Sequence, residues 1–237
     1  MPLENRMSVR RALIPLALAL LAAGCSDERH PTGVSPAPTP HVLRWAGSVP
    51  PQFIAPHLPT SGSGQRGLHA TLVDGLSLDR NLVTFWAVRG EERSVQVNYL
   101  SATGDTTFPF LQLAITDPVY VPGRGDLLPG DSVLVTVTID PAEIKVSLEP
   151  TGTVFGEPAR LKLSYGGADG DMNGDGVVDS TDAQIETHLL GLWYREGADS
   201  AWARIPASQS VGEKSFISAL RHFSDYEVSF SEYAVSW

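Results

Sequence analysis

Hydrophobic and polar residues alternate along most of the chain beyond residue 40. In the clearest run, 132–140, every second position from Val133 to Ile139 is apolar, and smaller or polar residues lie between. Gly, Pro, Asp and Ser separate the runs, as they do between short strands. Strands are predicted at 41–47, 68–73, 81–88, 94–100, 108–115, 132–140, 144–148, 160–165, 192–195, 202–205, 213–221 and 226–230. This pattern predicts a mainly β fold, an antiparallel β-sandwich.

Two stretches depart from the alternation. Residues 50–65 form a long segment without strand periodicity and are predicted to be a loop. Residues 179–190 have helical spacing, with Ile185 and Leu189 four positions apart on one apolar face. Strand-like runs resume after this helix. We therefore interpret 169–191, a loop followed by a helix, as an insertion in a single sandwich.

The N-terminal segment has a different character. Arg10 and Arg11 precede an apolar run, 12–24, which is too short to span a bilayer and is typical of a signal peptide. The following stretch, 26–40, is rich in proline and polar residues, as in a semi-extended tether. The predicted organisation is a signal peptide (1–24), a cysteine and tether (25–40), the sandwich (41–168 with 192–237) and the insertion (169–191).

One cysteine, Cys25, ends the apolar run. A single cysteine excludes a disulfide within the chain and a cysteine-based metal site. The segment Leu21-Ala22-Ala23-Gly24-Cys25 resembles the lipobox of bacterial lipoproteins. The resemblance implies cleavage before Cys25, a lipid on its sulfur and attachment to a membrane of the bacterial cell envelope, and Ser26 implies the outer membrane. The alternative is an ordinary secretory signal with an incidental cysteine.

The charge of the chain narrows the choice of partners. Its formal net charge is −10 at pH 7, and loss of residues 1–24, with three arginines and one glutamate, makes it −12. An acidic chain without a basic run is a poor candidate for binding nucleic acid or anionic lipid by charge. We expect no nucleic-acid partner.

An acidic segment, 171–182, lies at the start of the predicted helix and reads DMNGDGVVDSTD. Its spacing is that of a twelve-residue calcium loop of the EF-hand type, in which oxygen ligands surround the ion and a glycine at the sixth position permits a sharp turn. The alternatives are a turn that binds nothing and a Mg²⁺ site. The expected calcium ligands are the side chains of Asp171, Asn173, Asp175 and Asp182, the carbonyl of Val177, and Asp179 through water.

Two details of this segment refine its type. The last ligand position holds an aspartate, Asp182, and the residues before the loop are strand-like. Together with Asn173-Gly174-Asp175-Gly176, Ser180-Thr181-Asp182 and a helix ending Leu189-Leu190-Gly191, these details resemble a dockerin repeat. Dockerins carry such repeats in pairs, and this chain has one. We therefore interpret the loop as a structural clamp rather than a calcium sensor.

A second resemblance covers residues around the insertion. Segments 155–165, 192–194, 202–206 and 222–226 resemble the β-sandwich found in ankyrins, netrin receptors and many bacterial surface proteins. Members of that group are protein-interaction or structural modules, which is the role that the resemblance implies.

The sequence has no recognisable catalytic motif. It lacks a nucleophile elbow, a metalloprotease H-E-x-x-H, a P-loop and a dinucleotide glycine motif, and its six histidines show no zinc-ligand spacing. We expect no catalytic residue and a non-enzymatic, calcium-binding lipoprotein of the cell envelope. The alternatives are a calcium-dependent recognition module for an envelope protein or glycan, and a polysaccharide-processing hydrolase.

Overall fold

The computed structural model describes residues 40–61, 76–77, 81–100 and 107–231, which all belong to one compact unit, Ala37–Trp237. The predicted signal peptide, Cys25, the tether up to residue 39 and the predicted strand 68–73 lie outside the described residues. Within the described part of the chain, no helix is both long and apolar enough to cross a membrane.

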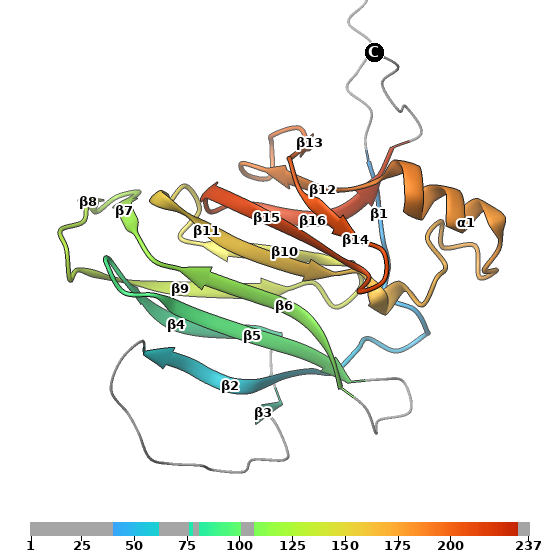
Figure 1. Cartoon of the computed structure of the whole chain (residues 1–237), viewed down its shortest axis with the longest axis horizontal. Coiled ribbons are helices and arrows are strands. Elements are labelled where there is room, and N and C mark those ends of the chain that lie inside the picture. The colour runs from blue at the N-terminus through green and yellow to red at the C-terminus, as the bar shows by residue number, and fades with distance from the viewer. Residues whose placement is uncertain (1–39, 62–75, 78–80, 101–106, 232–237) are drawn as a thin grey trace, which may run out of the picture. The chain divides into compact units, whose positions relative to one another are not determined.

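Two antiparallel sheets form the β-sandwich that the alternation predicted (Figure 1). Sheet 1 has seven strands among the described residues. In spatial order they are β13 (Ala203–Arg204), β12 (Leu190–Arg195), β16 (Asp225–Phe230), β10 (Lys145–Glu149), β9 (Ser132–Ile139) and β4 (Leu82–Val88), and β1 (His41–Val42) also pairs with β16.

Sheet 2 has nine strands among the described residues. Its spatial order is β14 (Ser208–Ser210), β15 (Ser215–His222), β11 (Val154–Ser164), β6 (Thr107–Ile115), β5 (Arg93–Leu100), β2 (Phe53–Ser61) and β3 (Leu76–Ser77), while β7 (Pro118–Val121) pairs with β11 and β8 (Gly125–Asp126). Residues 165–189, here called the crossover segment, join β11 of sheet 2 to β12 of sheet 1.

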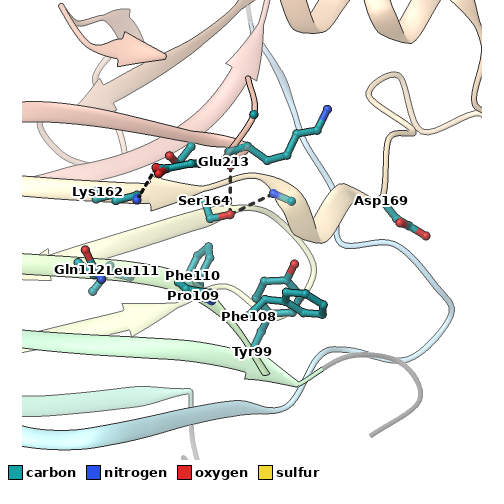
Figure 2. Close-up of a pocket in the computed structure, with 14 residues that line it drawn as sticks. Tyr99, Phe108, Pro109, Phe110, Leu111, Gln112, Lys162, Ser164, Asp169 and Glu213 are labelled. Atoms are coloured by element: carbon teal, nitrogen blue, oxygen red, sulfur yellow. Dashed lines mark hydrogen bonds and ion pairs between the residues drawn. The ribbon is translucent and has the colours of Figure 1, made fainter. Parts of the chain in front are cut away.

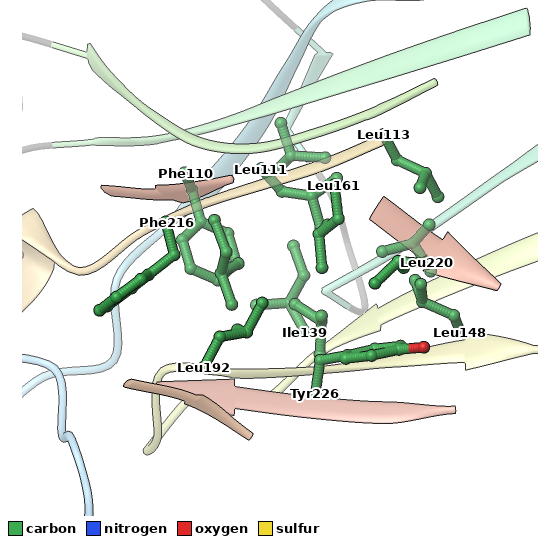
Figure 3. Close-up of a cluster of buried hydrophobic side chains, with 14 of the residues drawn as sticks. Phe110, Leu111, Leu113, Ile139, Leu148, Leu161, Leu192, Phe216, Leu220 and Tyr226 are labelled. Carbon is green, nitrogen blue, oxygen red and sulfur yellow. The ribbon is translucent and has the colours of Figure 1, made fainter. Parts of the chain in front are cut away.

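The core lies between the two sheets (Figure 3). In β9, burial alternates along the strand, and the buried Val135 and Val133 face Phe85 and Ala87 of β4 in register. Leucines of β6 and β11 cover the same core from sheet 2 (Figure 3). The alternation in the sequence is thus the burial pattern itself, because successive side chains of a strand point to opposite faces.

One end of the core is aromatic. The register between β5 and β6 shifts after Val97, so that Phe110 is buried next to the buried Leu111. The Phe110 ring lies 4.8 Å from the Trp45 ring between centroids. A Cβ on Gly167 would lie 2.3 Å from Trp45 Cζ3, so this indole packs directly on the backbone of the crossover segment.

The prediction of a loop at 50–65 was wrong, because β2 spans Phe53–Ser61. Its prolines, Pro56 and Pro59, cannot donate to a sheet ladder, and the register with β5 shifts on both sides of His57. On its other side β2 pairs only with the two residues of β3 among the described residues. A strand near a sheet edge tolerates such interruptions, although they conceal its periodicity in the sequence.

Candidate metal centre

The candidate calcium loop belongs to the crossover segment. A short 3₁₀ turn, Gly166–Ala168, follows β11, and Asp169 and Gly170 then adopt left-handed backbone angles, with φ of 52° and 90°. These angles reverse the chain into the loop. A short helix, α1 (Ser180–Gln184), follows the loop and continues as a π-helical turn, Ile185–Leu189. The predicted helix is therefore present, with its first residue at Ser180.

Asp171, at the first loop position, organises the first half of the loop. Its Oδ1 accepts hydrogen bonds from the backbone N–H groups of Gly174 (2.8 Å) and Asp175 (3.2 Å). Its Oδ2 accepts one from the N–H of Gly176, at 2.9 Å. Gly174 and Gly176 have φ of 76° and 85°, a region that a residue without a Cβ adopts at little cost. One carboxylate thus fixes the sharp turn that the loop requires.

Three further side chains fold back on the backbone two residues ahead of them. Asn173 accepts from the N–H of Asp175 at 2.9 Å, Asp175 from Val177 at 2.8 Å, and Asp179 from Thr181 at 2.7 Å. Asn173 also donates its amide N–H to Asp175, at 3.0 Å. The oxygen-bearing side chains at loop positions 1, 3 and 5 are therefore neighbours on the inner side of the turn.

Asp182 closes the loop at its last position. Its carboxylate accepts hydrogen bonds from the N–H groups of Met172 (2.8 Å), Asn173 (3.2 Å) and Asp179 (2.8 Å), and the residue is only 2% exposed. Burial raises the pKa of this carboxyl, but the backbone N–H groups outweigh that effect and hold its pKa below the usual value. Asp182 is thus held as an anion, and it ties the start of α1 to the start of the loop.

The oxygen-bearing side chains of the loop are turned towards its backbone. Across the described residues, no three His, Cys, Asp or Glu side chains converge closely enough to hold a metal ion as placed. The loop carboxylates point instead to the N–H groups of the loop. All expected ligands nevertheless offer oxygen, which a hard cation prefers. The Oδ2 atoms of Asp171 and Asp182 each accept one hydrogen bond and so retain a second lone pair. The residue types therefore fit Ca²⁺.

The two valines of the loop face outward. The side chains of Val177 and Val178 are 59% and 65% exposed. Val177 therefore has only its backbone carbonyl to offer an ion. Val178 lies against Gly170, where an added Cβ would be 3.2 Å from Val178 Cγ1. Its contact is with the entry of the loop rather than with the sandwich core.

The crossover segment is docked on the sandwich by apolar and polar contacts. Met172, Ile185 and Leu190 are 3%, 5% and 2% exposed and belong to the main core. Ile185 was predicted to contribute to the apolar face of the helix. The segment is therefore continuous with the hydrophobic core at both ends of the loop and helix.

A buried polar cluster, which the sequence did not indicate, adds to this docking. The carboxylate of Glu186 accepts from the Tyr165 hydroxyl at 3.0 Å and from Lys214 Nζ at 2.6 and 2.7 Å. Gln209 donates to the Glu186 carbonyl at 2.8 Å and to the Tyr165 hydroxyl at 3.1 Å. Burial and Glu186 raise the pKa of Tyr165, so that its hydroxyl stays a donor. Sheet 2 thereby holds the π-helical turn.

Comparison with known proteins adds no assignment. The chain matches no protein family, no curated protein and no solved structure.

Proposed function

We propose that this protein is a non-enzymatic, calcium-binding lipoprotein of the cell envelope, in which Ca²⁺ held by residues 171–182 fixes the crossover segment on the β-sandwich. The observation that carries the proposal is the closure of the loop by its own oxygen ligands. Asp171 and Asp182, eleven positions apart in sequence, both accept N–H groups from the first turn of the loop. This closure supports the proposal, because it brings the first and last expected ligands to the same turn.

The negative charge of the loop favours the binding of a cation. Four carboxylates lie within twelve residues, and no Lys or Arg occurs among them. Carboxylates held close together repel one another, and a divalent cation removes that repulsion. The four are Asp171, Asp175, Asp179 and Asp182. Because Met172 and Ile185 of the same segment are buried in the core, ordering of the loop also stabilises the sandwich.

The membrane part of the proposal rests on Cys25 and on its distance from the fold. The fold begins with β1 at His41, and residues 25–40 separate it from the lipid site. A proline-rich chain of this length, if extended at about 3.1 Å per residue, would span about 50 Å. A lipid on Cys25 would therefore let the sandwich stand clear of the bilayer, in line with a surface role.

Thermal unfolding of the full-length protein in detergent tests the calcium part. We expect a higher Tm in about 10 mM CaCl₂ than in chelator, with about 10 mM MgCl₂ giving a smaller rise. Extracellular calcium modules bind at about 10⁻⁴–10⁻³ M, so calcium at about 10 mM is about 10 to 100 times Kd and stabilises by about 1.4–2.7 kcal/mol. For a chain of this size, that corresponds to a shift of about 3–10 °C.

A matched pair of variants controls for charge. Asp175→Asn keeps an oxygen acceptor for the Val177 N–H but removes a ligand charge, and should reduce the calcium-dependent shift. Asp199→Asn removes the same charge from an exposed position outside the loop and should leave the shift intact. Equal Tm values of the wild type in calcium and in chelator would refute the proposal.

A further inference from the structure

A groove opens on sheet 2, and none of the expected calcium ligands lines it. It has a volume of about 600 Å³ and lies over the ends of β5, β6 and β11 and the turn that leads into β15 (Figure 2). The residues that carry its chemistry are Tyr99, Phe108, Gln112, Lys162, Asp169 and Glu213. Its floor is a paired sheet, so the shape of the groove is built into the fold.

An exposed aromatic ring stands in this groove. Phe108 is 44% exposed, and Tyr99 pairs with it across the strands, with ring centroids 5.6 Å apart (Figure 2). Tyr99 in turn packs on the buried Trp45, at 5.4 Å between centroids. The Phe108 ring is therefore supported from beneath, so that its exposed part is held in a fixed position in the groove.

The polar side of the groove is electrically balanced. The charged lining residues are two lysines and two acids, Lys162, Lys214, Asp169 and Glu213. Lys162 pairs with Glu213 at 2.8 Å, and Lys214 pairs with Glu186 at 2.6 Å. The hydrogen bond from Lys162 lowers the pKa of Glu213, so this pair stays charged and closed. A strongly charged ligand gains little here, while hydroxyl groups find both donors and acceptors.

A peptide cannot bind here by adding a strand. Strand addition needs a free sheet edge with unpaired backbone groups. The groove lies over β6, which pairs with β5 on one side and with β11 on the other, and Gln112 is in register with both Gln96 and Lys162. An occupant of the groove must therefore be recognised by side chains.

We propose that this groove binds a neutral oligosaccharide, with one sugar ring stacked on Phe108 and the hydroxyl groups of another ring along the groove bonded to Gln112, Lys162 and Glu213. A pyranose presents C–H groups on its faces and hydroxyl groups around its edge, and this is the combination that the groove matches. A groove of this volume accommodates several sugar rings, since ligand sites of a few hundred Å³ hold molecules of that size. The inference does not depend on calcium, because none of these four residues is an expected calcium ligand.

Titration calorimetry with the full-length protein in detergent tests the inference, using neutral hexasaccharides of the glucan, mannan and xylan types as probes. We expect at least one to bind, and Phe108→Ala to weaken that binding about tenfold, as for the loss of a central contact. Phe108→Tyr keeps the ring and should retain binding. Trp86→Ala removes an aromatic ring that is 57% exposed on sheet 1 and should change nothing.

Thermal unfolding checks that each variant is folded, and titrations run in calcium and in chelator separate this inference from the calcium proposal. Binding that depends on Phe108 in either condition supports the groove. The inference is overturned if no hexasaccharide binds, if Phe108→Ala binds as well as the wild type, or if hexagalacturonate or an uncharged peptide binds more tightly than every neutral sugar.

Discussion

At the scale of single residues, burial shifts the pKa of one carboxyl outside the loop, that of Glu227. Glu227 of β16 is 1% exposed, and its Oε1 accepts from the Ser229 hydroxyl at 2.7 Å. Its Oε2 has no hydrogen-bond partner in the described part of the chain. Burial raises the pKa of Glu227 to about 7, and the opposing effects of Ser229 and Lys145 do not cancel the rise.

This carboxyl predicts a pH dependence of stability. The folded protein holds a proton on Glu227 up to about pH 7, whereas the unfolded chain releases it near the ordinary glutamate pKa of 4.5. The contribution is therefore complete below about pH 4.5 and is lost as the pH rises towards about 7. At about 1.36 kcal/mol per pKa unit, the loss is on the order of 3 kcal/mol at most.

Glu227→Gln is the variant that tests this prediction, because it keeps an acceptor for Ser229 without the ionisable proton. Denaturant unfolding at pH 5 and pH 8 should show the variant gaining stability relative to the wild type at the higher pH. A difference between the two proteins that stays constant across this range would contradict the assignment.

The loop residues and Glu227 differ in how far the sequence alone indicates their role. The sequence alone suffices to name the expected calcium ligands, because calcium loops place ligands at fixed spacing along one segment, and their role stays a prediction. Glu227 could not be predicted, since the alternation of β16 places it on the outer face, where glutamate is ordinary. It is buried beside Trp193, its partner in register, whose indole N–H bonds to the Ser229 carbonyl at 3.1 Å. That contact joins residues far apart in sequence.

At the scale of elements, the crossover segment is held by one glutamate, Glu186, whose partners lie at the end of β11 and in the turn before β15. The sequence predicted the helix and its apolar Ile185, because both follow from spacing within one segment. It did not indicate Glu186, since Tyr165 and Lys214 lie 21 and 28 residues away. A pattern within one segment cannot predict contacts with residues so far away in the sequence.

Removing this side chain should loosen the segment. We expect Glu186→Ala to lower the free energy of unfolding by about 1–3 kcal/mol, because the Tyr165 hydroxyl and the Lys214 ammonium lose a buried acceptor. Hydrogen exchange should become faster in residues 171–189 than in β9. Glu157→Ala, at an exposed position of β11, is the control and should leave exchange of the segment unchanged. Unaltered exchange in Glu186→Ala would show that the cluster does not hold the segment.

At the scale of the whole molecule, alternation predicted the sandwich but not the order of its strands. β9 and β10 are neighbours in both sequence and space, whereas β11 pairs with β15 and β12 with β16. These pairings depend on which faces are buried together and on connections such as the crossover segment. The groove is a product of the same arrangement, because Phe108, Lys162 and Glu213 come from three separate parts of the chain.

The central claim is that one calcium ion binds at residues 171–182. Calorimetric titration of the full-length protein with CaCl₂ tests it most directly, alongside Asp175→Lys, which places a cation in the loop, and Asp199→Lys, which makes the same change at an exposed site elsewhere. We predict one ion bound per chain by the wild type and by Asp199→Lys, with Kd of about 10⁻⁴–10⁻³ M, and none by Asp175→Lys. No calcium binding by the wild type, or equal binding by Asp175→Lys, would contradict the account.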